Sequence, residues 1–193
     1  MGKEFELKYA ATEADLEKLK ARYPQLHPIT METTYYENDA GDFGRLKWTF
    51  RRRMENGKSV CTLKTPGVGH GCGEFEVLCE EILEAVPLLL AQGAPAELEA
   101  MVRGGIYPSC GARFTRLAGL LEIPGGKAEL ALDRGVLLGG GKELPFTEVE
   151  VELKAGSEEA TTAFAEALAA EFGLKPEFKS KVARARRVAA DNS

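Results

Sequence analysis

The sequence has few of the residues that build most zinc centres and nucleophilic active sites. Its 193 residues include only two histidines, His27 and His70, which are isolated from each other. They give no basis for a histidine metal site or a Ser-His-Asp triad. The four cysteines form no C-x-x-C pair, so we expect reduced thiols rather than a zinc site or a disulfide framework. They are Cys61, Cys72, Cys79 and Cys110.

Long apolar runs and an excess of positive charge are also missing. No apolar run approaches the roughly 18 residues that a membrane span requires, and the acidic N-terminus lacks the basic end and apolar block of a signal peptide. We therefore expect a cytoplasmic protein with no membrane partner. The net charge of −5 disfavours a nucleic-acid partner. Basic residues nevertheless gather at Arg51-Arg52-Arg53, which indicates a local anion site.

The composition, with 44% hydrophobic and 28% charged residues, fits one globular domain over residues 1–193. Alternating apolar and polar residues, separated by turn signals, predict about eight strands. They are expected at residues 3–10, 31–38, 45–54, 59–65, 74–76, 112–122, 127–133 and 146–154. Asn56-Gly57 predicts a tight hairpin turn between the third and fourth of these strands.

Helical spacing and capping signals predict three helical regions. They are expected at residues 13–22, 79–103 and 157–172. Thr12 and Ser157 are the predicted N-caps of the first and third regions, and Pro87 and Pro95 are expected to interrupt the second. The predicted fold class is therefore α+β, with an antiparallel sheet or closed barrel that is covered by helices.

Charged residues share one side of strand after strand. In Glu4-Phe5-Glu6-Leu7-Lys8, the period of two places two carboxylates and an ammonium on one face, with Phe5 and Leu7 on the other. The same parity recurs in the later strands. The residues that share it are Arg51, Arg53, Thr62, Lys64, Glu74, Glu76, Ala131, Asp133, Glu148, Glu150 and Glu152.

Two interpretations of this pattern differ in where the charged face lies. For a single strand, the ordinary one is a sheet with one solvated face and one core face. A solvated face would mix signs along each strand, whereas here two strands carry almost only carboxylates and another carries an arginine pair. The second interpretation is a barrel with a charged interior and helices outside. Such an interior suits a polyphosphate with a divalent metal, since carboxylates bind Mg²⁺ or Mn²⁺ and arginine forks match phosphate oxygens.

These motifs, taken in order, resemble the CYTH, or triphosphate tunnel metalloenzyme, superfamily. The resemblance begins with Glu4-x-Glu6-x-Lys8 and covers nearly the whole chain, and its last segments are most similar to the bacterial inorganic triphosphatase branch. The other matching segments are Tyr35-Tyr36-Glu37-Asn38, Arg51-x-Arg53, Thr62-Leu63-Lys64, Glu74-x-Glu76, 129–135, 148–154 and Lys179-Ser180-Lys181. The resemblance implies an eight-stranded antiparallel β-barrel with a charged tunnel that holds a triphosphate, and helices packed outside.

The resemblance also implies a role for each inward charged residue. The metal ligands would be Glu4, Glu6, Asp133, Glu148, Glu150 and Glu152, with Mg²⁺ or Mn²⁺ as the cofactor. The phosphate-binding residues would be Lys8, Arg51, Arg53, Lys64, Arg116 and Lys181. Glu6, Lys8 and Lys64 would take part in catalysis. Glu74 and Glu76 would hold basic residues in place or help to bind a second metal.

Some basic positions depart from this set. Cys72 stands where the family commonly has an arginine, so one phosphate contact is absent or comes from another residue. Either Arg113 or Arg116 supplies the later inward arginine, and the spacing Phe114-x-Arg116 favours Arg116. Arg52 has the opposite parity and is expected on the surface. Three arginines near the C-terminus are expected to be solvated charges: Arg184, Arg186 and Arg187.

The predicted activity is metal-dependent hydrolysis of inorganic triphosphate or a short polyphosphate. The expected partner is a small anionic substrate, and the expected assembly is a monomer or a homodimer. Three alternatives remain open: a class IV-type adenylyl cyclase, a thiamine triphosphatase, and a catalytically weak polyphosphate-binding module. The last alternative follows from Cys72, which removes one expected contact to the phosphate.

Overall fold

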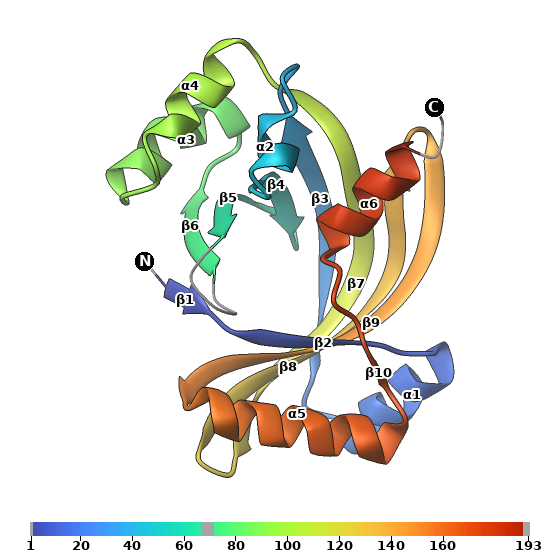
Figure 1. The fold of residues 1–193 in the computed structure, drawn as a ribbon. Helices are drawn as coiled ribbons and strands as arrows, with labels where there is room; N and C mark the ends of the chain where they lie inside the picture. Colours follow the sequence, from blue (N-terminus) through green and yellow to red (C-terminus); the bar gives the residue numbers. More distant parts are fainter. Residues whose placement is uncertain (1, 67–71, 191–193) are drawn as a thin grey trace.

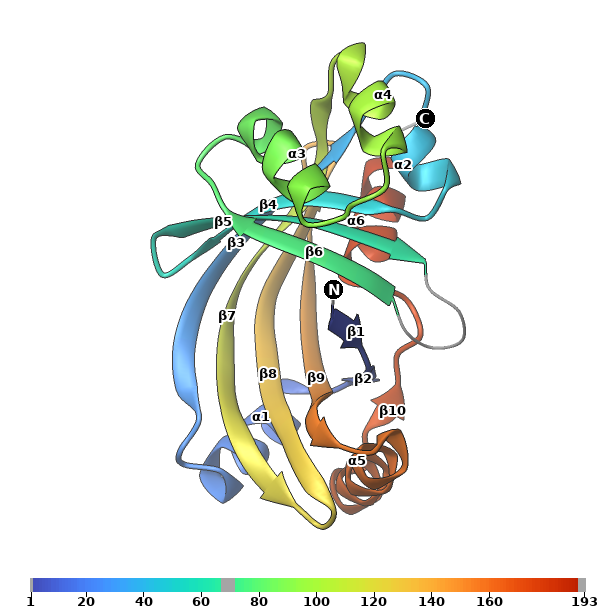
Figure 2. The same cartoon turned by 90° about the vertical axis from the view of Figure 1, so that its left-hand side faces the viewer.

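The strands form one curved antiparallel sheet with helices packed against it (Figures 1 and 2). The computed structural model describes residues 2–66 and 72–190, and the side chains of 5–66 and 73–190. The strands are β1 (Gly2–Glu4), β2 (Glu6–Ala10), β3 (His27–Glu37), β4 (Thr49–Glu55), β5 (Lys58–Pro66), β6 (Cys72–Leu78), β7 (Tyr107–Ile123), β8 (Gly126–Gly139), β9 (Lys142–Gly156) and β10 (Lys175–Pro176). The helices are α1 (Glu13–Arg22), α2 (Asp42–Arg45), α3 (Ile82–Ala91), α4 (Glu97–Arg103), α5 (Glu158–Phe172) and α6 (Lys181–Ala190).

The first segment of the chain joins the two ends of the sheet. The strand order is β1-β6-β5-β4-β3-β7-β8-β9-β2-β10, so β1 pairs with β6 while β2 pairs with β9. Only Phe5 separates β1 from β2. Within the described residues, β1 and β2 therefore form one bent segment that links the β6 end of the sheet to β9, with the two-residue β10 added outside. The predicted fold class, an antiparallel sheet with helices packed against it, is confirmed, but the hydrogen-bonded ladder does not close into a continuous barrel and the two ends are linked through the chain at Phe5.

Local signals place several element boundaries. The Thr12 side chain accepts a hydrogen bond from the backbone N–H of Asp15, and the Asp15 carboxylate accepts one from the Thr12 N–H, which forms a capping box at α1. Ser157 caps α5 in the same position, with its hydroxyl accepting from Ala160. Asn56 and Gly57 both have positive φ, 48° and 81°, as the tight turn between β4 and β5 requires.

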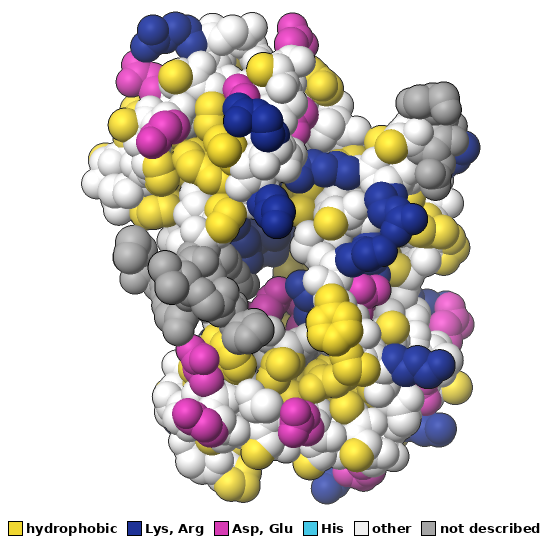
Figure 3. All heavy atoms as spheres, in the orientation of Figure 1, with side chains coloured by type: hydrophobic (Ala, Val, Ile, Leu, Met, Phe, Trp, Pro, Cys, Tyr) yellow, Lys and Arg dark blue, Asp and Glu magenta, His cyan; other side chains and the backbone are white. Residues whose placement is uncertain are grey.

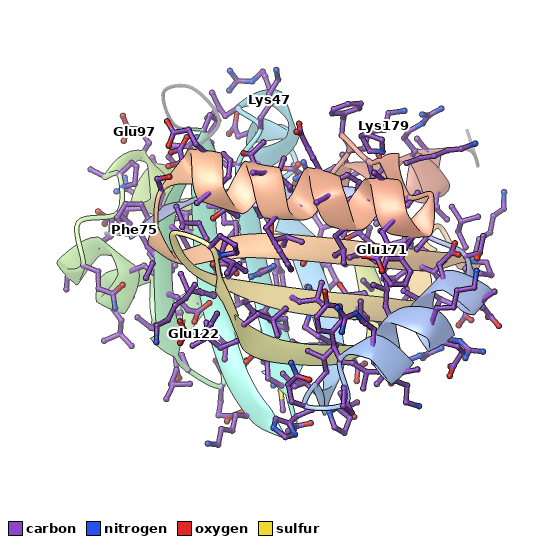
Figure 4. The ribbon with its side chains drawn as sticks, turned by 90° about the horizontal axis from the view of Figure 1, so that it is seen from below. Lys47, Phe75, Glu97, Glu122, Glu171 and Lys179 are labelled. Carbon is purple, nitrogen blue, oxygen red and sulfur yellow. The ribbon has the colours of Figure 1, made fainter. Side chains whose placement is uncertain are left out.

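Most of the helices cover the outer face of the sheet. On one side, α1 and α5 pack over β8 and β9, where Leu19 and Leu168 contact a cluster that contains Leu130 and Val149. Figure 4 shows the side of the sheet on which these two helices lie. On the other side, α3 and α4 cover β4 to β6 with a second cluster around Phe50. Burying each such side chain contributes about 1.5–3 kcal/mol to stability. The apolar residues on the outer face of the strands therefore hold these helices in place.

Helix α6 packs instead on the inner side of the sheet. Its Val182 belongs to a cluster with Met31, Tyr35 and Phe114, and all four residues line the central cavity. The inner faces of β7 to β9 are thus charged along only part of their length and apolar where α6 covers them. Gly139 permits the contact, since a Cβ there would lie 2.6–2.7 Å from α6 backbone atoms.

Three local features differ from the sequence predictions. Pro87 lies inside α3 rather than interrupting it. Proline has no N–H to donate, so the carbonyl of Leu83 loses its helical partner there. The basic C-terminal segment, expected as a solvated tail, contains α6, and the short α2 had no clear sequence signal. Among the described residues, the structure has no helix that is long and apolar enough to cross a membrane.

Candidate functional site

The inner face of the sheet lines a cavity of about 840 Å³. Figure 3 shows a hollow on one face of the molecule with lysine and arginine side chains inside it. One wall, from β2, β8 and β9, contributes Glu6, Lys8, Glu129, Glu150, Glu152 and Lys154. The opposite wall, from β4 to β6, contributes Arg51, Arg53, Glu55, Lys64, Glu74 and Glu76. The charged face of each of these strands therefore points into the cavity, and the interpretation of this face as solvated surface is wrong.

Three carboxylates meet at one end of this wall. Asp133 and Glu148 lie opposite each other in the β8–β9 register, and Glu150 follows two residues later on the same face. Ligand oxygens of all three lie within 4.8 Å of one another, and all three residues are buried. Glu150 lines the cavity, while Asp133 and Glu148 lie behind it with no exposed surface. We call this set the acidic triad.

Basic residues neutralise the acidic triad. Lys181, at the start of α6, places its Nζ 2.8 Å from Asp133 Oδ2 and 2.7 Å from Glu150 Oε1, and it also bonds to Glu148. Arg116 on β7 donates from Nε and Nη2 to the two oxygens of Asp133 at 2.8 and 2.7 Å. The triad is thus satisfied by fixed cations, as buried charges must be.

The shared cations set the protonation of the triad. Burial alone would lower the pKa of Lys181, but Asp133, Glu150 and Glu148 outweigh it and raise that pKa. Burial also opposes ionisation of Glu150, yet Lys181 and Arg116 hold its pKa well below the ordinary range. The pKa of Glu148 is raised to about 7, because burial outweighs the opposing charge of Lys181. The ammonium of Lys181 therefore stays charged at neutral pH.

The acidic triad fits a hard divalent cation by its donor chemistry. Carboxylate oxygens are the ligands that Mg²⁺ and Mn²⁺ prefer, and the triad presents three of them within one ion's reach. Glu6 and Glu152 face each other in the β2–β9 register and line the cavity nearby. For the whole triad to ligate one ion, Lys181 would have to give up its contacts to these oxygens. The side chain of Glu4 lies outside the described residues.

The opposite wall is suited to an anion. Arg51 lies 3.9 Å from Glu74, Lys64 lies 3.3 Å from the same carboxylate, and Arg53 pairs with Glu55. Among the described residues, the Nε atoms of Arg51 and Arg53, like that of Arg184, are nevertheless buried without a hydrogen-bond partner. Burial and the neighbouring Arg51 lower the pKa of Arg53, so an anion bound here would be stabilising. Unpaired buried donors of this kind are rare in folded proteins and call for an acceptor.

The structure also decides where the ambiguous basic residues lie. Arg116 faces the cavity, whereas Arg113 is about half exposed and pairs with Glu143 at 2.8 Å. Arg52 points to the other face, where it bonds to Ser59. Arg184 was expected to be a solvated charge, and that expectation is wrong: its side chain is 15% exposed and bonds to Glu148. It lies one helical turn after Lys181, so the helix brings both to the triad. The side chain of Cys72 is not among those described.

Sequence reasoning missed several residues that line the cavity. Glu129 lies on the same strand face as Asp133, and Lys154 on the same face as Glu152, so the alternation of the sequence could have predicted that both line the cavity. Glu55 continues the same alternation after Arg51 and Arg53 and could have been predicted in the same way. Lys47 also lies within the strand predicted at 45–54 and alternates in step with Arg51 and Arg53, although in the structure it precedes β4, in the turn after α2.

The sequence of this chain is similar to those of known proteins. A family model described as the CYTH domain matches residues 2–185. An inorganic triphosphatase from Haemophilus influenzae is 27% identical over 144 residues, which make up 72% of this chain and 40% of that protein. The chain therefore spans less than half the length of that relative.

Two solved structures share the fold over nearly the whole chain. A protein from Bacillus halodurans, described as a candidate adenylate cyclase, has a TM-score of 0.70 at 19% identity, covering 93% of this chain and 96% of its own. A protein from Hippeastrum, described as a candidate adenylyl cyclase with a dominant triphosphatase activity, has a TM-score of 0.66 at 18% identity, covering 97% of both chains. At these identities the likeness concerns the fold alone.

Proposed function

The chain belongs to the CYTH domain family, and on that premise we propose that it hydrolyses inorganic triphosphate or a short polyphosphate with the help of Mg²⁺ or Mn²⁺. The observation that carries the proposal concerns Arg51 and Arg53, whose buried Nε donors have no hydrogen-bond partner in the part of the chain that the structure describes. Both line a cavity whose opposite wall is rich in carboxylates. A metal-bound polyphosphate offers oxygen acceptors to the first wall and a cation to the second.

Each wall has a distinct part in the proposed reaction. Arg51, Arg53 and Lys64 bind phosphate oxygens and hold the chain of phosphates across the cavity. A bound divalent cation would supply charge neutralisation and Lewis acidity at those oxygens, and its ligands would come from the acidic triad with Glu6 and Glu152. A second metal, if bound, would draw on Glu74 or Glu76.

Hydrolysis then needs a positioned water and a stabilised leaving group. Water attacks the terminal phosphorus, the bridging P–O bond breaks, and diphosphate leaves with the bonding electron pair. Lys8, held by Glu6 at 3.1 Å, and Arg116 stabilise the charge that develops on the leaving group. No covalent nucleophile is required. Lys181 balances the charge of the acidic triad until a cation binds there, and would give up these contacts when the triad ligates the ion.

The test is a substrate screen on the full chain with Mg²⁺ or Mn²⁺, using inorganic triphosphate, ATP and thiamine triphosphate. We expect phosphate release from inorganic triphosphate. Cyclic AMP formation from ATP, or a preference for thiamine triphosphate, would instead support the corresponding alternative. Tight triphosphate binding without turnover would support a polyphosphate-binding module.

A substitution tests whether the opening motif lies in the site. Glu6→Gln should lower the rate of phosphate release about 10- to 100-fold, as expected when a metal-binding carboxylate is neutralised. Glu122→Gln is the matched control, because Glu122 is an exposed carboxylate that pairs with Lys127 away from the cavity. An unchanged rate in Glu6→Gln would show that the motif is not part of the active site.

A further inference from the structure

Lys47 adopts a backbone conformation that is uncommon for a side chain of its kind. It lies in the turn between α2 and β4 with φ of 56°, in the left-handed region that favours glycine. Its N–H donates to the Gly44 carbonyl at 3.1 Å, and the next N–H, of Trp48, donates to Phe43 at 2.8 Å. Non-glycine residues in this conformation carry strain, which often marks a functional position.

Its side chain differs from the other basic side chains that line the cavity. Lys8, Arg51, Arg53, Lys64, Arg116, Lys154 and Lys181 all have a carboxylate within ion-pair distance. Lys47 lines the same cavity, and within the described part of the chain it has no ion pair or hydrogen bond through its ammonium. It is exposed, so it stands where the cavity opens to solvent.

The turn that carries Lys47 is held firmly. The Glu37 carboxylate accepts hydrogen bonds from the backbone N–H groups of Phe43 and Gly44, at 3.0 and 2.8 Å. Arg186 of α6 donates to the Trp48 carbonyl at 3.4 Å and lies 3.6 Å from Glu37. The backbone of Lys47 is therefore fixed from both sides, and the ammonium is carried on a defined support.

We propose that Lys47 is a further substrate-binding residue, which donates to an oxygen of the outermost phosphate at the mouth of the cavity. This inference rests on the proposed function. A cation that is already paired must share or leave its carboxylate to bind phosphate, whereas the Lys47 ammonium need break no existing ion pair. Figure 4 shows Lys47 and Lys179 on the same side of the molecule. Phe178, which precedes Lys179, also lines the cavity.

The conformation of Lys47 provides a sharp test, because charge and strain can be removed together. Lys47→Asn and Lys47→Gly both suit a positive φ, so each variant should melt at least as high as the unmodified protein. Both should raise the KM for inorganic triphosphate with Mg²⁺ about five- to tenfold, as expected for a lost charge-assisted hydrogen bond at an exposed site. The KM should also become less sensitive to salt, and Lys47→Arg should retain most of the affinity.

Lys58→Asn is the matched control, since Lys58 is an exposed lysine in the β4–β5 hairpin that does not line the cavity. Its KM should stay within twofold of the unmodified protein. If the unmodified protein hydrolyses triphosphate and the Lys47 variants keep its KM and salt dependence, the role of Lys47 is overturned while the proposed function stands. If the unmodified protein neither binds nor hydrolyses triphosphate, both the proposed function and the role of Lys47 are overturned.

Discussion

At the scale of single residues, Lys181 links the carboxylates at the acidic end of the cavity. Its ammonium contacts all three carboxylates of the acidic triad and lies 5.3 and 5.7 Å from the ring centres of Phe114 and Phe146. The charge is therefore enclosed by carboxylates on one side and aromatic faces on the other. Such a residue both neutralises the triad and anchors the first turn of α6.

Removing that charge should destabilise the protein. Lys181→Met leaves a buried triad with only Arg116 and Arg184 to compensate it, and breaking a buried ion pair costs about 3–5 kcal/mol. Urea denaturation should show a correspondingly lower midpoint. Lys179→Met, which removes an exposed lysine two residues away, should change the midpoint little. Equal midpoints for the two variants would mean that Lys181 does not stabilise the fold.

At the scale of elements, α6 is the helix that shapes the cavity. It brings Lys181 and Arg184 to the triad, places Val182 among the lining residues, and reaches the α2 turn through Arg186. One ten-residue helix thus links the acidic end of the cavity to the turn that carries Lys47. Its close approach to β8 depends on Gly139.

A side chain at Gly139 should weaken the docking of α6. In Gly139→Val the new Cβ would lie 2.6 Å from the Ala189 nitrogen and 2.7 Å from the Ala185 oxygen, and overpacking of this kind costs about 1–3 kcal/mol. Amide hydrogen exchange should accelerate in α6 while α5 keeps its protection. Gly104→Ala is the control, because its φ is −80° and a Cβ there meets no atom within 4 Å. Unchanged exchange in α6 would contradict this packing.

At the scale of the whole molecule, the sheet encloses a cavity whose lining carries nearly equal numbers of acidic and basic side chains. Carboxylates and basic residues face each other across about 840 Å³, and the bent segment β1–β2 ties the edges of the sheet together at Phe5. A ligand that contacts both walls should therefore couple them and stabilise the native state as a whole.

Ligand binding should accordingly appear in the melting temperature. Inorganic triphosphate with Mg²⁺ at about 100 times its dissociation constant should add about 2.7 kcal/mol of stability, which differential scanning calorimetry would record as a higher melting temperature. Mg²⁺ or triphosphate alone should give a smaller shift. A ligand-independent melting temperature would show that the cavity does not bind this pair.

Much of the fold could be predicted from the sequence because its signals are local. Thr12 and Ser157 mark the starts of α1 and α5, Asn56-Gly57 marks a hairpin, and parity separates Leu130 and Val149 from the charged residues beside them. Caps, turns and strand alternation each depend on residues within a few positions of one another. The same parity placed the cavity-lining residues of β2, β4, β5, β6 and β9 on one face.

The sequence by itself therefore determined the strands, their inward charges and the family resemblance, but not what those charges contact. Only the tertiary structure decided that α6 packs inside the sheet, that Arg184 joins Lys181 at the acidic triad, and that Asp133 and Glu148 lie behind the cavity wall rather than on it. These outcomes depend on contacts between residues far apart in the chain, such as Glu148 with Arg184 and Gly139 with Ala185. No local propensity or period encodes such contacts, since they arise only when the curved sheet brings the elements together.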